Sequence, residues 1–207
     1  HVFNRGVDKR NIFSNKAQQH FFFNRMQVLN TTDSSKFFNN QRNKHKDSGI
    51  VGDGGQLVSV IAYSLLPNHY HLLLKQEADN GISQFMQKLG TSYTMYFNQQ
   101  EKRSGSLFQG KFKATHLSGD FALPTVSAYI NLNHKHHRID PSINLVKSSI
   151  FEYLDQELGE SICNPVEIQA IIKESDGLIQ YKKFIKQASI TFADNKGNTL
   201  KLDDFEF

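Results

Sequence analysis

The feature that most constrains the fold is an apolar stretch that is interrupted once, at Pro67-Asn68. Val58 to Leu66 is rich in β-branched, aromatic and leucine residues, and Leu72-Leu73-Leu74 continues the apolar character after the interruption. Such runs are typical of buried strands, and an intervening proline and asparagine are typical of a turn. The sequence therefore predicts a hairpin of two central strands, over about residues 57–65 and 69–76.

Two histidines, His69 and His71, begin the second of these strands. Because residues two apart on a strand point to the same side, we expect both imidazoles on one face of the sheet and Tyr70 on the other. Two imidazoles on one rigid face can supply two nitrogen ligands to a divalent metal. The alternative is a pair of histidines that pack and hydrogen-bond without a metal.

Length and composition limit the possible classes of protein. The chain has 207 residues, enough for one domain of ordinary size or for one domain with an appendage. Its single cysteine, Cys163, excludes an intrachain disulfide and favours a reducing compartment, so we expect a cytoplasmic protein. No apolar run approaches the length of a membrane span, so we expect no membrane partner. The net charge of +4 is compatible with a nucleic-acid partner without requiring one.

The rest of the chain alternates between helical periodicity and short extended runs. The predicted elements are a strand that ends near Gly6, a helix capped by Ser14 or Asn15, a polar insertion over about 30–56, the two central strands, a helix opened by Asn80 or Ser83, a strand over 106–117, a helix from Pro124 or Thr125 to Asn133, and helices over 165–174 (capped by Asn164) and 178–187. An antiparallel central sheet with helices packed on one face satisfies this order, so we expect an α+β sandwich. We place one domain at 1–140 and a helical extension with a polar tail at 141–207.

The helix expected to reach Asn133 can supply the further ligand and the nucleophile that a metal site at the histidine pair lacks. Tyr129 and Asn133 are four residues apart and share one helix face. If that face packs over the histidines, the side-chain oxygen of Asn133 can be a third ligand and the Tyr129 hydroxyl can reach a metal-bound phosphate. A phenol, with its usual pKa of about 10, needs a nearby cation or a metal-polarised phosphate to attack efficiently. The alternative for Tyr129 is an aromatic residue that packs on the apolar side of its helix.

Other candidate residues have simpler interpretations. Tyr93 and Tyr96 lie on an apolar helical stripe, so we expect them to pack in the core. His134, His136 and His137 could bind a metal, but a basic helix end that complements the helix dipole is the simpler interpretation.

An ordered series of motifs resembles a known family. The series consists of Asn4-Arg5-Gly6, the run from Ala62 to Leu73 around Pro67-Asn68-His69-Tyr70-His71, Tyr93 with Tyr96-Phe97-Asn98, the stretch from Gly105 to Lys113, and Tyr129-Ile130-Asn131-Leu132-Asn133. In this order the motifs resemble those of the single-tyrosine HUH transposases, and most closely the REP-associated tyrosine transposase branch. Ser148-Ser149, Tyr153 and the stretch from Tyr181 to Phe184 resemble the C-terminal region of that branch, so the resemblance covers residues 1 to about 187.

The resemblance implies a fold, a reaction and a set of functional residues. The implied fold is the HUH sandwich, which is ferredoxin-like or RRM-like. His69, His71 and Asn133 match the ligands of a divalent metal, Mg²⁺ or Mn²⁺, and Tyr129 matches the nucleophile. The implied reaction is transesterification of single-stranded DNA beside a DNA hairpin, with a 5′-phosphotyrosine link and a released 3′-hydroxyl. The basic residues expected to contact DNA phosphates are Arg5, Lys9, Arg10, Arg103, Lys111 and Lys113.

Two positions depart from the pattern of that branch. It often has Asn-Pro where this chain has Asn133-His134, and often has arginine where this chain has Lys111. Without the proline the helix can continue past Asn133, and lysine keeps the charge of arginine without its bidentate geometry.

Three classes of function stay open at this level. The first is the DNA-nicking transposase, the second is a nucleic-acid-binding module that keeps the fold without the chemistry, and the third is a metal-dependent phosphodiesterase that uses water as the nucleophile. A monomer and a homodimer are both open, because related transposases include dimers with shared active sites.

Overall fold

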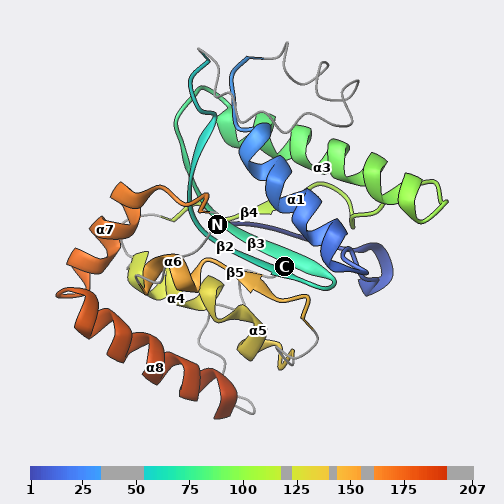
Figure 1. Cartoon of the computed structure of the whole chain (residues 1–207). Coiled ribbons are helices and arrows are strands. Elements are labelled where there is room, and N and C mark those ends of the chain that lie inside the picture. Colours follow the sequence, from blue (N-terminus) through green and yellow to red (C-terminus); the bar gives the residue numbers. More distant parts are fainter. Residues whose placement is uncertain (34–53, 118–122, 140–143, 155–160, 195–207) are drawn as a thin grey trace.

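The computed structural model describes residues 1–33, 54–117, 123–139, 144–154 and 161–194, with side chains as far as residue 191. In these residues, five strands form one sheet in the order β4-β1-β3-β2-β5, and every neighbouring pair is antiparallel (Figure 1). The strands are β1 (Val2–Arg5), β2 (Val58–Leu66), β3 (His69–Gln76), β4 (Lys113–Ala114) and β5 (Lys147–Ser148). The predicted α+β class with an antiparallel central sheet is confirmed.

The two central strands are β2 and β3, and they form the hairpin that the sequence predicts. Every residue of β2 is buried, as are the first six residues of β3. The turn is tied to the N-terminal part of the chain, because the Pro67 carbonyl accepts hydrogen bonds from the N–H groups of Ile12 and Phe13 at 2.7 and 3.0 Å. These contacts hold the end of the hairpin at which His69 lies.

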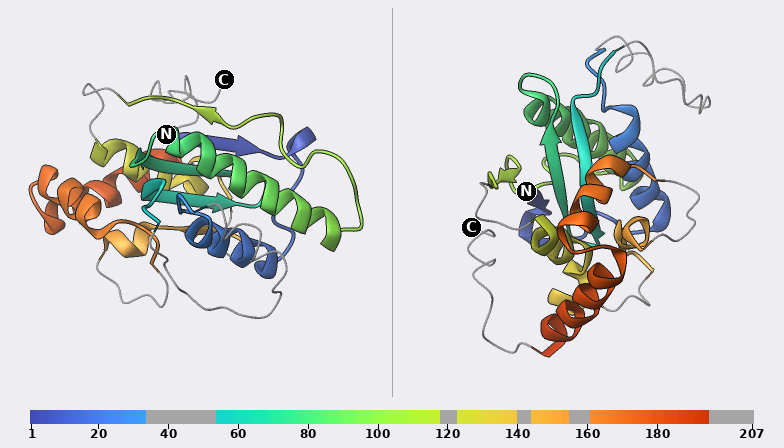
Figure 2. Two further views of the ribbon diagram at one scale, coloured as in Figure 1. Left: turned by 90° about the horizontal axis from the view of Figure 1, so that it is seen from above. Right: turned by 90° about the vertical axis from the view of Figure 1, so that its left-hand side faces the viewer.

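Helices cover both faces of the sheet (Figures 1 and 2). One face carries α1 (Lys16–Val28) and α3 (Gly81–Gln100), and the other carries α4 (Leu123–Asn131), α5 (Asn133–His136) and α6 (Ile150–Tyr153), with α7 (Pro165–Glu174) and α8 (Leu178–Asp194) packed against α4. The Tyr70 ring lies 5.2 Å from that of Phe22 in α1, whereas the His71 ring lies 6.0 Å from that of Tyr129 in α4. The expectation of helices on one face is therefore wrong. Strands that are apolar on both sides need cover on both sides.

The helices start at or beside the predicted capping residues. The Asn15 side chain accepts a hydrogen bond from the Gln18 N–H at 2.9 Å at the start of α1. The Asn164 side chain accepts one from the Val166 N–H at 2.9 Å at the start of α7, so both caps are confirmed. α3 begins directly after Asn80, whose side chain makes no capping bond. α8 continues to Asp194, beyond the predicted end at 187.

The strand expected over 106–117 is reduced to the two residues of β4. Upstream of β4, Phe108 makes an isolated bridge with Gly6 beside the end of β1. Gly105 and Gly110 have positive φ angles of 87° and 78°, so the chain turns where a strand would stay extended.

The helix expected to reach Asn133 ends two residues earlier, and α5 begins at Asn133 after a break at Leu132. The Leu132 N–H still donates to the Ala128 carbonyl at 2.9 Å, and the His137 N–H donates to the Asn133 carbonyl at 3.0 Å. The chain thus keeps a nearly helical path through the break, and Asn133 and His137 lie one turn apart.

The polar insertion lies mostly outside the described residues, but its two ends meet. The Thr32 N–H donates to the Gly55 carbonyl at 2.9 Å. The Asn30 side chain accepts hydrogen bonds from the N–H groups of Leu57 and Val58 at 3.1 and 2.9 Å. The insertion therefore leaves the fold and returns to it at one place, just before β2.

The C-terminal helices share a continuous core with the sheet. The Tyr181 ring of α8 stacks on the Tyr153 ring of α6 with centroids 5.5 Å apart, and its hydroxyl lies 3.2 Å from Ser127 Oγ of α4. The end of the predicted polar tail, 195–207, lies outside the described residues. Among the helices that are described, none combines the length and apolarity needed to cross a membrane.

Candidate functional site

The two histidines of β3 lie on the sheet face that α4 covers. In the antiparallel register His71 is opposite Phe3 of β1, and His69 is opposite Arg5. Directly opposed residues point to the same face, so Phe3 and Arg5 share the face of the histidines. The rings of Phe3 and His71 are stacked with centroids 5.5 Å apart, and the rings of His69 and His71 are 5.2 Å apart. Both histidines are buried.

Neighbouring side chains contact the Nδ1 atom of each histidine. His69 Nδ1 lies 2.6 Å from Asn68 Oδ1, and His71 Nδ1 lies 2.9 Å from His1 Nε2. Hydrogen bonds of this kind orient metal-ligating histidines in proteins. Because Nδ1 is engaged in both rings, Nε2 is the nitrogen of each ring that could ligate a metal.

The environment keeps His71 uncharged. Burial lowers the pKa of His71 well below its ordinary value of 6.5, and the electrostatic influence of His69, His137, His136 and Arg5 acts in the same direction. A neutral imidazole is the form that binds metal ions, so His71 needs no deprotonation before it can act as a ligand at neutral pH.

Helices α4 and α5 bring Tyr129 and Asn133 to the histidine face. Asn133 Oδ1 lies 3.2 Å from His69 Nε2, and the Tyr129 ring lies 6.0 Å from the His71 ring. Tyr129 and Asn133 are both buried. The structure therefore places together the four residues that sequence reasoning selected for chemistry, although two of them come from β3 and two from the segment after residue 123.

A buried polar network holds α4 against the sheet. Ser149 Oγ donates to Asn131 Oδ1 at 2.6 Å and accepts a hydrogen bond from the Tyr63 N–H of β2 at 3.0 Å. The contact between Tyr181 of α8 and Ser127, one turn before Asn131 on the same side of α4, ties α4 to α8. These bonds fix how α4 is rotated and hence where Tyr129 points.

His137 belongs to the same cluster and is the functional candidate that sequence reasoning set aside. One potential ligand atom from each of His69, His71 and His137 lies within 4.8 Å of the other two. The rings of His69 and His137 are 4.6 Å apart, and His137 is half-buried. The signal was present in the sequence, because 129, 133 and 137 repeat at the four-residue spacing of a helix face.

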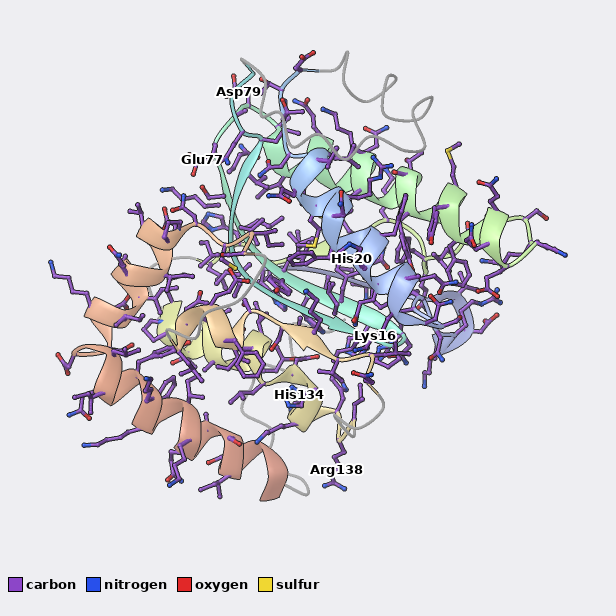
Figure 3. The ribbon with its side chains drawn as sticks, viewed as in Figure 1. Lys16, His20, Glu77, Asp79, His134 and Arg138 are labelled. Atoms are coloured by element: carbon purple, nitrogen blue, oxygen red, sulfur yellow. The ribbon has the colours of Figure 1, made fainter. Side chains whose placement is uncertain are left out.

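Other residues of the segment after Asn133 lie outside the histidine cluster. His134 is half-buried, and burial lowers its pKa, with a further contribution from Lys135. Arg138 is exposed and projects away from the protein (Figure 3). The His136 ring lies 5.5 Å from that of Tyr129, beside the tyrosine.

Two of the predicted DNA contacts share the face of the site. Arg5 is half-buried opposite His69. Lys113 of β4 is opposite Phe3 in the register and is exposed, so it lies on the same face at the edge of the sheet.

The other four predicted DNA contacts are not brought to the histidines by the strand register. Lys9 and Lys111 are exposed. Arg10 forms an ion pair with Asp8 at 3.3 Å. The guanidinium of Arg103 lies over the ring of Phe97 in α3, 5.8 Å from its centroid.

The two other tyrosines weighed as nucleophiles have packing roles. The Tyr93 hydroxyl donates to the Ile12 carbonyl, and burial raises the pKa of Tyr93 above its ordinary value. The Tyr96 ring stacks on that of Phe21 with centroids 3.7 Å apart. Both lie in α3, on the sheet face opposite the histidines.

The fold and the site define the class of protein. An antiparallel α+β sandwich carries a histidine–hydrophobic–histidine motif on a central strand, with a tyrosine helix packed over it, and this is the arrangement of the HUH transposases. A family model described as "Transposase IS200 like" matches residues 23–133, and the chain belongs to this family. It is therefore a transposase-family protein whose partner is DNA. No curated protein and no solved structure matches the chain.

Proposed function

We propose that this protein is a single-stranded DNA transposase of the REP-associated branch, with Tyr129 as its nucleophile. The observation that carries the proposal is that Tyr129 and Asn133 lie over the same sheet face as His69 and His71. A nucleophilic hydroxyl next to a set of metal-ligating atoms is what metal-assisted phosphoryl transfer requires. Residues 1–140 form the catalytic domain in this proposal, and 141–207 form an extension that supports α4.

The donor atoms at the site fit a divalent cation. The Asn68 amide group donates to the Lys9 carbonyl at 3.4 Å, so its Oδ1 faces His69 and can only accept. His69 Nδ1 then carries the hydrogen, and Nε2 of the neutral ring presents a lone pair toward Asn133 Oδ1. This nitrogen and the Asn133 oxygen, 3.2 Å apart, would be two ligand atoms for one divalent cation.

His69, His71 and Asn133 would hold the metal, for which the family resemblance implies Mg²⁺ or Mn²⁺. When bound there, a divalent metal supplies Lewis-acid polarisation of the scissile phosphate. The protein supplies the orientation of these ligands, through Asn68 on His69 and His1 on His71.

Tyr129 carries the covalent step of the proposed reaction. Its phenolic oxygen forms a bond to the scissile phosphorus while the bond from that phosphorus to the 3′ oxygen breaks. The phenolic proton is lost to solvent or to a neighbouring base, and the leaving oxygen takes up a proton to become a 3′-hydroxyl. The product is a 5′-phosphotyrosine, which keeps the ester bond energy, so rejoining needs no nucleotide cofactor.

Basic residues guide the DNA strand in this proposal. Arg5 and Lys113, on the face of the site, contact phosphates next to the cut. Lys9, Arg10, Arg103 and Lys111 contact phosphates further away, on the adjoining DNA hairpin.

The proposal is tested by incubating the protein with a labelled, hairpin-bearing single strand and a divalent metal. Wild-type protein should give a denaturation-resistant DNA adduct, and Tyr129→Phe should give none while it still binds the DNA. Tyr96→Phe is the matched control, because Tyr96 is a partly exposed tyrosine on the opposite sheet face, and it should form the adduct normally.

The same assay separates the rival functions. Cleavage without an adduct in wild-type protein identifies a phosphodiesterase that uses water. Binding without cleavage identifies a DNA-binding module, and an adduct that persists in Tyr129→Phe refutes the assigned nucleophile. Light scattering on the same samples distinguishes a monomer from a homodimer.

A further inference from the structure

We propose that His137 is a third imidazole ligand of the metal, and that the centre therefore binds Zn²⁺ or Co²⁺ in preference to Mg²⁺. The inference rests on the proposed metal site at His69 and His71. It goes beyond that site, because it adds a ligand and changes the class of metal that the centre selects.

The three histidines are near enough to one another to share a metal after modest rearrangement. The potential ligand atoms of His69, His71 and His137 all lie within 4.8 Å of one another. A tetrahedral metal with bonds of about 2.0–2.1 Å to nitrogen holds its ligand atoms about 3.4 Å apart. Side-chain movements of up to about 1.4 Å are therefore needed to bring all three nitrogens onto one metal.

The backbone after α4 places His137 next to the histidines of β3. The His137 N–H donates to the Asn133 carbonyl at 3.0 Å, so His137 follows Asn133 by one helical turn. Asn133 Oδ1 already contacts His69 Nε2, and the His137 ring lies edge-on to the His69 ring. The chain thus presents an amide oxygen and an imidazole from successive turns to the same pair of strand residues.

The donor atoms of the cluster favour a transition metal. Within the described residues, the cluster contains three imidazoles and no carboxylate. Mg²⁺ prefers oxygen ligands, above all carboxylates and water, whereas imidazole suits Zn²⁺, Co²⁺ and Ni²⁺. With Asn133 as an oxygen ligand the set is three nitrogens and one oxygen, which favours a first-row transition metal along the order Mn²⁺, Co²⁺, Zn²⁺.

The experiment measures metal binding to the full chain without DNA. Mg²⁺, Mn²⁺, Co²⁺ and Zn²⁺ are titrated separately into metal-free protein, in competition with a chromophoric chelator, and the visible absorption of bound Co²⁺ is recorded. The wild-type protein should bind one Zn²⁺ or Co²⁺ per chain at least a hundredfold more tightly than Mg²⁺. Circular dichroism verifies that each variant is folded.

The variants separate His137 from its surroundings. His137→Ala should lower Zn²⁺ and Co²⁺ affinity at least tenfold, or about 1.4 kcal/mol, and shift the Co²⁺ absorption bands. His137→Gln, which replaces the imidazole by an amide, should reduce the preference for Zn²⁺ over Mg²⁺. His134→Ala is the matched control, because this half-buried histidine of the same segment lies outside the cluster, and its affinities should stay within threefold of wild type.

The outcomes distinguish this inference from the proposed function. If His69→Ala abolishes binding while His137→Ala leaves affinity and the Co²⁺ spectrum unchanged, His137 is not a ligand and the metal site of the proposed function stands. A wild-type protein that binds Mg²⁺ as tightly as Zn²⁺ also overturns the inference. If wild-type protein binds none of the four ions, both the inference and the proposed metal site are wrong.

Discussion

Replacing Ser149 by alanine should destabilise the protein by about 2–4 kcal/mol. Ser149 is fully buried, and its hydroxyl donates to Asn131 Oδ1 at 2.6 Å while it accepts the Tyr63 N–H at 3.0 Å. Ser149→Ala removes both bonds where water cannot easily replace them. A buried polar group that loses its partner costs about 1–3 kcal/mol, and two groups are affected here, while the added apolar surface offsets a little of the sum.

The loss should be visible in both chemical and thermal unfolding. Native domains are stable by about 5–15 kcal/mol, so a change of this size is a large fraction of the total. For a chain of 150–250 residues it corresponds to a fall in Tm of roughly 4–16 °C. Urea unfolding followed by circular dichroism gives the free energy directly, provided that wild type and variant share the same slope.

A matched substitution tests whether the loss of stability comes from the buried network or from the removal of any serine hydroxyl. Ser175 is half-buried at the end of α7, and its hydroxyl donates to the Ile171 carbonyl at 2.9 Å. Water can replace that bond, so Ser175→Ala should cost less than about 1 kcal/mol. If Ser149→Ala costs no more than Ser175→Ala, the network does not hold α4 energetically and the argument for the placement of Tyr129 loses its support.

Three further predictions follow from the same structure. Arg5→Ala should weaken single-stranded DNA binding and lower the slope of log affinity against log salt concentration by about one. Arg10→Ala should have a smaller effect on both quantities, because Asp8 already pairs with that guanidinium. Fluorescence anisotropy at several salt concentrations measures both quantities. Asn164→Ala should cost about 1 kcal/mol in urea unfolding, because α7 loses its N-cap, and an unchanged midpoint would contradict this. Burial raises the pKa of the Cys163 thiol well above its ordinary value of 9.0, so as the pH rises the unfolded chain loses this proton before the folded chain does. The contribution of Cys163 to the free energy of unfolding should therefore be complete below pH 9 and should fall above it by up to about 1.4 kcal/mol per pH unit. Cys163→Ala should remove this contribution to the pH dependence of stability.

Local patterns in the sequence predict local structure well in this chain. The turn at Pro67-Asn68, the alternation of His69 and His71 about Tyr70, and the caps at Asn15 and Asn164 all depend on residues within a few positions of one another. Periodicity and capping chemistry are encoded at that range. The prediction of a strand over 106–117 was wrong because the chain turns at Gly105 and Gly110, where φ is positive.

Local patterns in the sequence predict one part of the candidate site, and long-range packing decides the other part. That two imidazoles point to one side of a central strand follows from the residue pattern, because a strand alternates with a period of two. Its motif series also selected Tyr129 and Asn133 as candidate site residues. The sequence did not determine that helices cover both faces of the sheet, nor that His137 joins His69 and His71.

These two features depend on contacts between residues that lie far apart in the chain, so they emerge when the helices pack on the sheet. The position of α4 is fixed by Ser149 and Tyr181, which follow it, and by β2, which precedes it. His137, which the sequence assigns to a basic helix end, joins a cluster that could hold a metal when packing places it over the histidine strand. Burial and neighbouring charge then keep His71 neutral, and that property arises from the assembled environment of the side chain.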